Sequence, residues 1–94
     1  MKKTVEIRKE GRAATICYTE GENRHDFYAE IGGGETLLVI SAPSADEWSS
    51  VISWGAGRRQ SILEFVARDV IRQESLNSKF IVHPLGIDIL MPEP

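Results

Sequence analysis

One cysteine, two histidines and no long apolar run set the first limits on this 94-residue chain. A single thiol, Cys17, excludes an internal disulfide and any site that needs several thiolate ligands, and it fits a reducing compartment. No stretch reaches the roughly 18 consecutive apolar residues that a membrane helix needs. The charged N-terminus has no apolar segment behind it, so we expect no secretory signal and a cytoplasmic location.

Charge is distributed unevenly along the chain, whose formal net charge is −3. Residues 1–12 carry a net charge of +3, whereas residues 13–57 hold one basic residue, Arg24, against seven acidic ones. An acidic protein without a basic stripe is a poor nucleic-acid binder, because phosphate contacts supply most of the nonspecific affinity. We therefore expect neither nucleic acid nor a membrane as a partner.

Apolar and polar side chains alternate in the first third of the chain, which is typical of strands with one buried face. Glycines between these segments predict hairpin turns. The segment 37–40 is apolar at every position and predicts a strand that is covered on both faces. The predicted strands are 4–8, 14–19, 25–31 and 36–40, and the side chains expected to face the core in the first hairpin are Val5, Ile7, Ala14, Ile16 and Tyr18.

Helix signals follow the fourth strand. Ser44 and Glu47 have the spacing of a capping box, which predicts a short helix that begins at Ala45 and ends at the glycines 55 and 57. No glycine or proline interrupts residues 58–74, where apolar residues recur at helical spacing and predict a second helix. Its apolar stripe is Leu63, Val66, Ala67 and Val70.

Two more strands, 79–83 and 87–91, are predicted after the second helix, joined by a turn at Pro84. Short connections between strands require antiparallel neighbours. The sequence therefore predicts an α+β domain: an antiparallel sheet with a four-strand meander, two helices packed on one face and a C-terminal β-hairpin. We expect residues 1–91 to form a single domain and residues 92–94 to be a flexible tail.

One aromatic residue on the second helix falls outside the apolar stripe. On a helical wheel Phe65 lies on the polar side, with Arg68 and Arg72. Aromatic residues and arginine are enriched in the energetically dominant parts of interfaces, so these three residues are a candidate partner-binding face. The alternative is that Phe65 packs under the first helix or a loop.

The sheet itself supplies a second candidate surface. Apolar residues stand on both faces of the later strands, while two helices can cover only one face of so small a sheet. We expect the second face to be shared with a protein partner or a second copy of the chain, with Leu38 and Ile40 of the fourth strand as contact residues. The alternative is a strongly curled sheet that encloses its own second face.

An anion site is the alternative binding function. Gly55 and Gly57 come just before the second helix and Arg58 and Arg59 begin it, so free backbone N–H groups and two guanidinium groups could converge on a phosphate or carboxylate. Glycines between helices are also ordinary connectors, and in that case no ligand is implied.

Catalytic and metal signals are weak. His25 and Asp26 are adjacent on a strand and so point to opposite faces, and His83 has no partner at metal-ligand spacing. Cys17 has no histidine close in sequence that could activate it. We expect no enzyme activity, no cofactor and no metal site.

Taken together, these features predict a small non-catalytic interaction module that is homodimeric or that binds and masks a protein partner. In size and acidity the chain resembles many small bacterial accessory proteins, including toxin-neutralising and phage-encoded inhibitor proteins. This resemblance rests on no sequence motif and implies only the general role.

Overall fold

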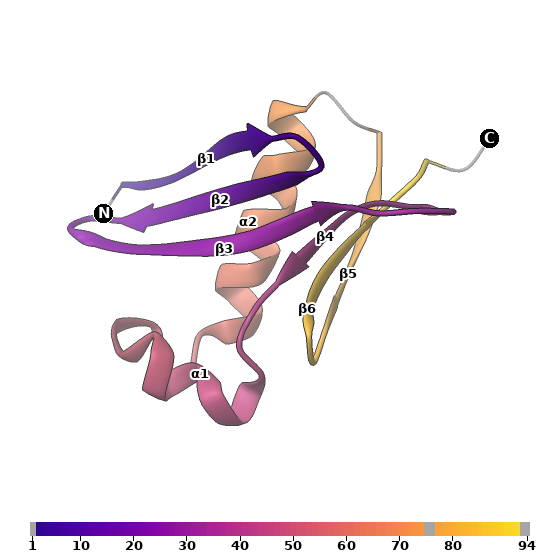
Figure 1. Cartoon of the computed structure of the whole chain (residues 1–94). Coiled ribbons are helices and arrows are strands. Elements are labelled where there is room, and N and C mark those ends of the chain that lie inside the picture. Colours follow the sequence, from indigo (N-terminus) through magenta and orange to yellow (C-terminus); the bar gives the residue numbers. More distant parts are fainter. Residues whose placement is uncertain (1, 75–76, 93–94) are drawn as a thin grey trace.

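The computed structural model describes residues 2–74 and 77–92, and it shows a six-stranded sheet with a long helix packed against it (Figure 1). The predicted α+β fold is confirmed, with both helices after the fourth strand and a hairpin at the C-terminal end. Residues 93–94 of the predicted tail lie outside the described residues. The elements are β1 Lys3–Glu10, β2 Ala13–Glu20, β3 Asn23–Ile31, β4 Thr36–Ser41, α1 Ala45–Val51, the 3₁₀ turn η1 Ser53–Gly55, α2 Arg59–Gln73, β5 Lys79–His83 and β6 Gly86–Leu90.

All neighbouring strands are antiparallel, in the order β1-β2-β3-β4-β6-β5. The C-terminal hairpin joins the sheet through β6, which pairs with β4 and leaves β5 at the edge. Gly86 permits this close approach, since its φ is 143° and a Cβ atom there would lie 1.9 Å from the carbonyl oxygen of Ile40. Glycine alone tolerates both the dihedral angle and the contact.

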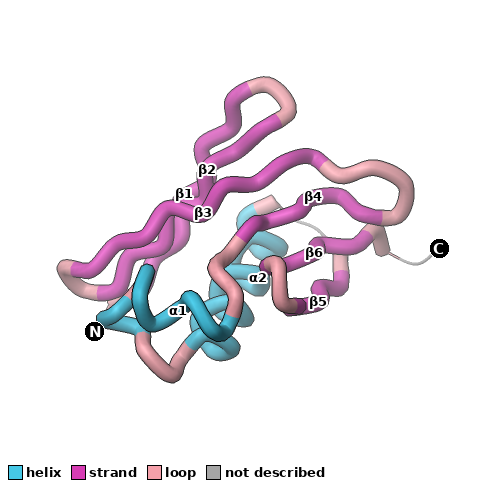
Figure 2. The backbone as a smooth tube through the Cα atoms, turned by 60° about the horizontal axis from the view of Figure 1, so that its bottom comes forward, coloured by secondary structure: helices cyan, strands magenta, loops and turns pink. Residues whose placement is uncertain are grey.

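The core lies between the sheet and the helices, which sit together on one side of it (Figure 2). The first hairpin turns its inward side chains to this core as predicted, with Ile7 less buried than the others. Burying a large aliphatic side chain contributes roughly 1.5–3 kcal/mol, so the apolar stripe is what holds α2 to the sheet. The buried residues of α2 are Ile62, Leu63, Val66, Ala67 and Val70, which contain the whole predicted stripe.

The first helix begins at Ala45 as predicted but ends four residues early, at Val51. Ser44 is the residue before the helix, yet its hydroxyl donates to the Glu47 carboxylate, at 3.0 Å, instead of capping a backbone N–H. The chain then winds into η1 around the buried Trp48, whose indole Nε1 donates to the carbonyl oxygen of Gly55 at 2.7 Å. This side-chain bond replaces the last helical turn that the sequence pattern predicts.

Coverage of β4 on both faces is not observed. Ile40 is buried, whereas Leu37, Leu38 and Val39 are only half-buried. Both helices lie on the same side of the sheet, so its outer face carries no helix among the described residues (Figure 2). Tyr28, 52% exposed, belongs to this outer face, so the sheet does not curl around to enclose it.

Candidate functional site

The predicted anion site is already occupied by side chains of the protein itself. Arg58 donates two parallel hydrogen bonds to the carboxylate of Glu20, from Nη1 to Oε1 at 2.7 Å and from Nη2 to Oε2 at 2.6 Å. Glu20 is 2% exposed and accepts a further bond from the Tyr18 hydroxyl at 3.0 Å. The guanidinium of Arg58 thus has an internal carboxylate as its anion.

This network has strong electrostatic consequences. The hydrogen bonds from Arg58 and Tyr18 outweigh the desolvation of the carboxylate and lower the pKa of Glu20 to about 2. Burial and the bond to Glu20 raise the pKa of Tyr18 to about 12. Near neutral pH the pair is therefore ionised and Tyr18 is protonated, which suits an internal structural pair.

Arg59 points away from Arg58, so the expected convergence of two guanidinium groups is wrong. Its Nε donates to the carbonyl oxygen of Pro43 at 2.8 Å, and its Nη2 donates to those of His83 and Pro84 at 2.9 and 3.2 Å. These bonds tie α2 to the loop before α1 and to the β5–β6 turn. Gly55 and Gly57 act as connectors: Gly55 is buried under Trp48, and Gly57 makes a turn with φ 75°.

The structure brings together the three residues predicted as a partner-binding face, and each of them also contacts other side chains of the domain. Phe65, Arg68 and Arg72 line one shallow hollow together with Lys3 of β1. The Phe65 ring is half-buried, edge-on to Tyr18 with ring centroids 5.8 Å apart, and the Lys3 ammonium lies 5.6 Å above it. Phe65 therefore packs against the first two strands, and the alternative expectation of cover by the first helix or a loop names the wrong element.

The two arginines of this face also have partners. Arg68 lies 5.7 Å from the ring centre of Phe80 and reaches the Glu64 carboxylate at 3.5 Å. Arg72 pairs with Asp69 at 2.7 Å. Three basic side chains, Lys3, Arg68 and Arg72, and two acidic ones, Glu64 and Asp69, line this open hollow. Its lining is therefore mainly charged.

The two residues expected on the open sheet face both lie on the other side of the sheet. Ile40 is fully buried in the core, so it is not available to a partner, and its assignment to a contact surface is corrected. The reason is the strand's side-chain alternation: Leu38 and Ile40 share the inner face, and Val39 faces outward between them. Leu38 is nevertheless accessible, because it lines a cleft that opens on the inner side.

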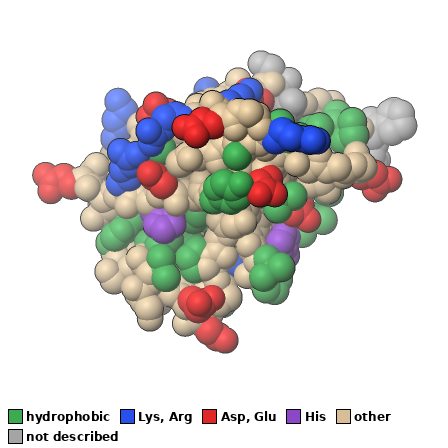
Figure 3. Space-filling model, viewed as in Figure 1, with side chains coloured by type: hydrophobic (Ala, Val, Ile, Leu, Met, Phe, Trp, Pro, Cys, Tyr) green, Lys and Arg blue, Asp and Glu red, His purple; other side chains and the backbone are tan. Residues whose placement is uncertain are grey.

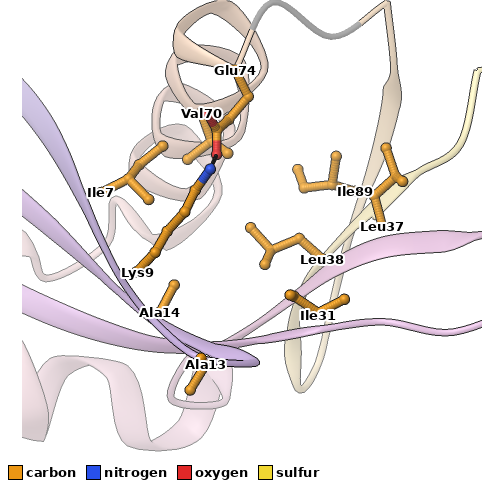
Figure 4. A pocket seen from close by; sticks show the side chains of 11 residues that line it. Ile7, Lys9, Ala13, Ala14, Ile31, Leu37, Leu38, Val70, Glu74 and Ile89 are labelled. Carbon is orange, nitrogen blue, oxygen red and sulfur yellow. Dashed lines mark ion pairs between the residues drawn. The ribbon is translucent and has the colours of Figure 1, made fainter.

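This cleft, of about 290 Å³, is an apolar hollow. It lies between β1 and β2 on one side, β3, β4 and β6 on the other, and the end of α2 (Figure 4). Ile7 and Val70 line one side of it, and Ile31, Leu38 and Ile89 line the other. Ile31 is 54% exposed, which is unusual for an isoleucine that points to the core side of a sheet. The remaining lining residues are Lys9, Gly11, Ala13, Ala14, Leu37 and Glu74.

The pairing of strands explains why the cleft exists. β2 pairs with each of its neighbours over eight residue pairs, whereas β3 and β4 pair over three, from Ala29 opposite Ile40 to Ile31 opposite Leu38. Beyond Ile31 the chain turns into β4 through the β3–β4 loop, and the β1–β2 turn points in a different direction (Figure 2). Small residues at that turn leave the space unfilled, so the inner side of the sheet opens to solvent there.

One ion pair borders the cleft. The Lys9 ammonium lies 2.6 Å from the Glu74 carboxylate, and Figure 4 shows this pair reaching from β1 to the end of α2. Lys9 is well exposed, so the pair adds little stability. It does place one positive and one negative group beside an apolar hollow, where they can bond the backbone of a bound segment.

Sequence reasoning missed a cluster on the outer face of the sheet. Cys17 is buried there under two arginines: Arg8 Nη2 donates to its sulfur at 2.9 Å and Arg24 Nη2 at 3.4 Å. Arg24 also donates a hydrogen bond to Asp26, at 2.9 Å. This bond and a hydrogen bond between Asp26 and Cys17 lower the pKa of Asp26. The strand register brings these residues together, and in Figure 3 basic side chains gather over this part of the molecule.

The two histidines lie apart on the surface shown in Figure 3. His25 stacks edge-on against Phe27, with ring centroids 4.6 Å apart, and its burial lowers its pKa. His83 Nε2 lies 3.0 Å from the Asp88 carboxylate. Among the described residues, no three histidine, cysteine or carboxylate side chains gather as metal ligands would.

Comparisons with protein-family models, with curated proteins and with solved structures found no significant match to this chain. Neither helix of the described chain combines the length and the apolarity needed to cross a membrane.

Proposed function

We propose that this domain is a non-catalytic protein-interaction module that holds an apolar side chain of a protein partner in the cleft beside Leu38. The observation that carries the proposal is the open apolar hollow itself, with Ile31 half exposed at its edge. Exposed apolar surface of this kind marks interaction sites on soluble domains. Lys9 and Glu74, the charged residues that line the cleft, are paired with each other. This pairing supports a role in binding a ligand and not in catalysis.

The size of the cleft supports one anchor side chain as its occupant. Pockets for drug-sized molecules and cofactors span about 300–1,000 Å³, and this hollow is at the lower limit of that range. Burying one leucine- or phenylalanine-sized side chain contributes roughly 1.5–3 kcal/mol, a factor of about 10 to 150 in affinity. Further contacts outside the cleft would supply the rest of the affinity.

The first test asks whether the cleft takes an aliphatic side chain at all. N-acetyl-leucinamide is titrated into methyl-labelled protein, and methyl resonances are followed. We expect saturable shifts at Ile7, Ile31, Leu38, Val70 and Ile89. Shifts confined to other methyl groups, or none at high probe concentration, would reject the cleft as the site.

The second test uses two substitutions on the same strand. Ile31→Asp places a charge at the edge of the cleft, whereas Tyr28→Asp changes an equally exposed residue on the opposite face of β3. A protein captured by the wild type and by Tyr28→Asp, but lost with Ile31→Asp, is the expected partner. Equal capture by all three proteins would show that binding occurs away from the cleft.

A further inference from the structure

The two edges of the sheet differ in how they are protected. β1, at one edge, carries charged residues along its length, including Glu6, Arg8 and Lys9. β5, at the other edge, has the sequence KFIVH, with charged or titratable residues only at its two ends. Natural proteins protect edge strands with charges, because unpaired backbone groups there recruit further strands. β1 has this protection and the centre of β5 lacks it.

The side chains of β5 show which of its surfaces are free. Phe80 and Val82 turn inward and pack against the core, and Arg68 lies over the Phe80 ring. Ile81, between them, turns outward and is 52% exposed. Phe80 and Val82 thus anchor β5 to the core, while Ile81 faces solvent and β5 forms the edge of the sheet.

We propose that β5 pairs antiparallel with β5 of a second copy of this chain, on a two-fold axis that passes beside Ile81. The sequence of the strand is self-complementary in this arrangement. Ile81 lies opposite Ile81, and Phe80 lies opposite Val82, so apolar residues meet on both faces. A closed two-fold pair also leaves no unprotected apolar edge, because β1 then forms both ends of the joined sheet.

The pairing goes beyond the proposed partner binding and leaves that site free. The cleft is lined from β1, β2, β3, β4, β6, α2 and the β1–β2 turn, so a copy bound along β5 does not fill it. Two strands of five residues bury less than the about 1,200–2,000 Å² of a standard stable interface. We therefore expect a dimer that dissociates on dilution.

The experiment measures mass by sedimentation equilibrium from micromolar to millimolar concentration. The wild type should rise from 10.5 kDa toward twice that mass. Ile81→Lys and Ile81→Glu should each weaken dimerisation at least tenfold, since like charges then face each other across the axis. An equimolar mixture of the two variants should recover the dimer, because opposite charges now meet. Val51→Lys, at an equally exposed isolated position on α1, is the control and should behave as the wild type.

A second measurement does not depend on a charged variant folding. Ile81→Cys, made together with Cys17→Ser, should form a disulfide-linked dimer under mild oxidation, whereas Val51→Cys in the same background should not. Wild-type mass that stays at 10.5 kDa at millimolar concentration would overturn the proposal. So would single variants that dimerise as the wild type does, or a mixture that stays monomeric. Loss of partner capture by Ile31→Asp does not depend on these results, so each proposal can fail alone.

Discussion

Arg58, the residue before α2, clamps the carboxylate of Glu20, the last residue of β2, through two parallel hydrogen bonds of 2.7 and 2.6 Å. Arg58 Nη2 also donates to the carbonyl oxygen of Trp54, at 3.1 Å, so the same side chain fixes the turn between the helices. Sheet, turn and long helix therefore meet at one guanidinium group. Arg58, which the sequence predicts as a ligand of an external anion, instead binds a carboxylate within the fold.

Breaking the ion pair between Arg58 and Glu20 should destabilise the domain. Arg58→Ala leaves the Glu20 carboxylate buried without its counter-ion, which costs about 3–5 kcal/mol for a fully buried pair. Because Arg58 is 39% exposed, water can partly replace it, and we expect roughly 2–3 kcal/mol in the free energy of unfolding by urea. Arg72→Ala, which breaks the exposed pair with Asp69, is the control and should cost less than about 1 kcal/mol. Equal losses in the two variants would contradict a structural role for the clamp.

The same pair predicts how stability depends on pH. The pKa of Glu20 is lowered in the folded state from 4.5 to about 2, so its contribution is complete above pH 4.5 and is lost as pH falls toward 2. The shift corresponds to roughly 3 kcal/mol, and it should be measured as the difference between wild type and Glu20→Gln across that range. Asp26, whose pKa is also lowered, acts in the same direction, so Asp26→Asn is the comparison variant. A wild-type curve parallel to that of Glu20→Gln between pH 2 and 4.5 would refute the assignment.

The fold could be predicted from local patterns, because they report which face of an element is buried. The period-2 alternation around Ile16 and the helical recurrence around Val66 depend on nearest neighbours in the chain, and both are confirmed. The end of α1 could not be predicted in this way. It is set by the indole of Trp48 bonding a carbonyl seven residues later, a tertiary contact that overrides the helical pattern.

The candidate site was harder to predict, because it depends on pairings between distant segments. Glu20 and Arg58 lie 38 positions apart, and neither is marked as a partner of the other by its surroundings in sequence. The cleft beside Leu38 arises because β3 and β4 pair over only three residue pairs, a length that composition does not determine. The apolar run at 37–40 predicted an exposed apolar face on the side of the sheet away from the helices, whereas the cleft opens on the core side and Ile40 is buried.

Phe65 provides a test of whether the helix face is structural. Its ring fills the space between Tyr18 and the Lys3 ammonium, so Phe65→Ala should remove about 2–3 kcal/mol of stability, less than the 3–5 kcal/mol of a fully buried phenylalanine. Urea unfolding measures this loss, and sedimentation should show self-association unchanged at concentrations where the variant is folded. Weakened association with full stability would instead return Phe65 to the partner-binding face predicted from sequence.

Gly86 tests the strand order that leaves β5 at the edge. A methyl group at this position would collide with the backbone of Ile40, and the φ of 143° is one that alanine rarely adopts. Gly86→Ala should therefore cost at least about 3 kcal/mol, which lowers the melting temperature by roughly 12–24 °C for a domain of this size. Gly33→Ala is the matched control, since a Cβ atom there meets nothing within 4 Å, and it should melt near the wild type. Hydrogen exchange shows which strands the substitution destabilises. If β6 joins the sheet through β4, the amides of β5 and β6 lose protection together in Gly86→Ala. A variant that melts as the wild type does would mean that β6 does not pass this close to β4, and the exposed edge at β5 would have to be assigned again.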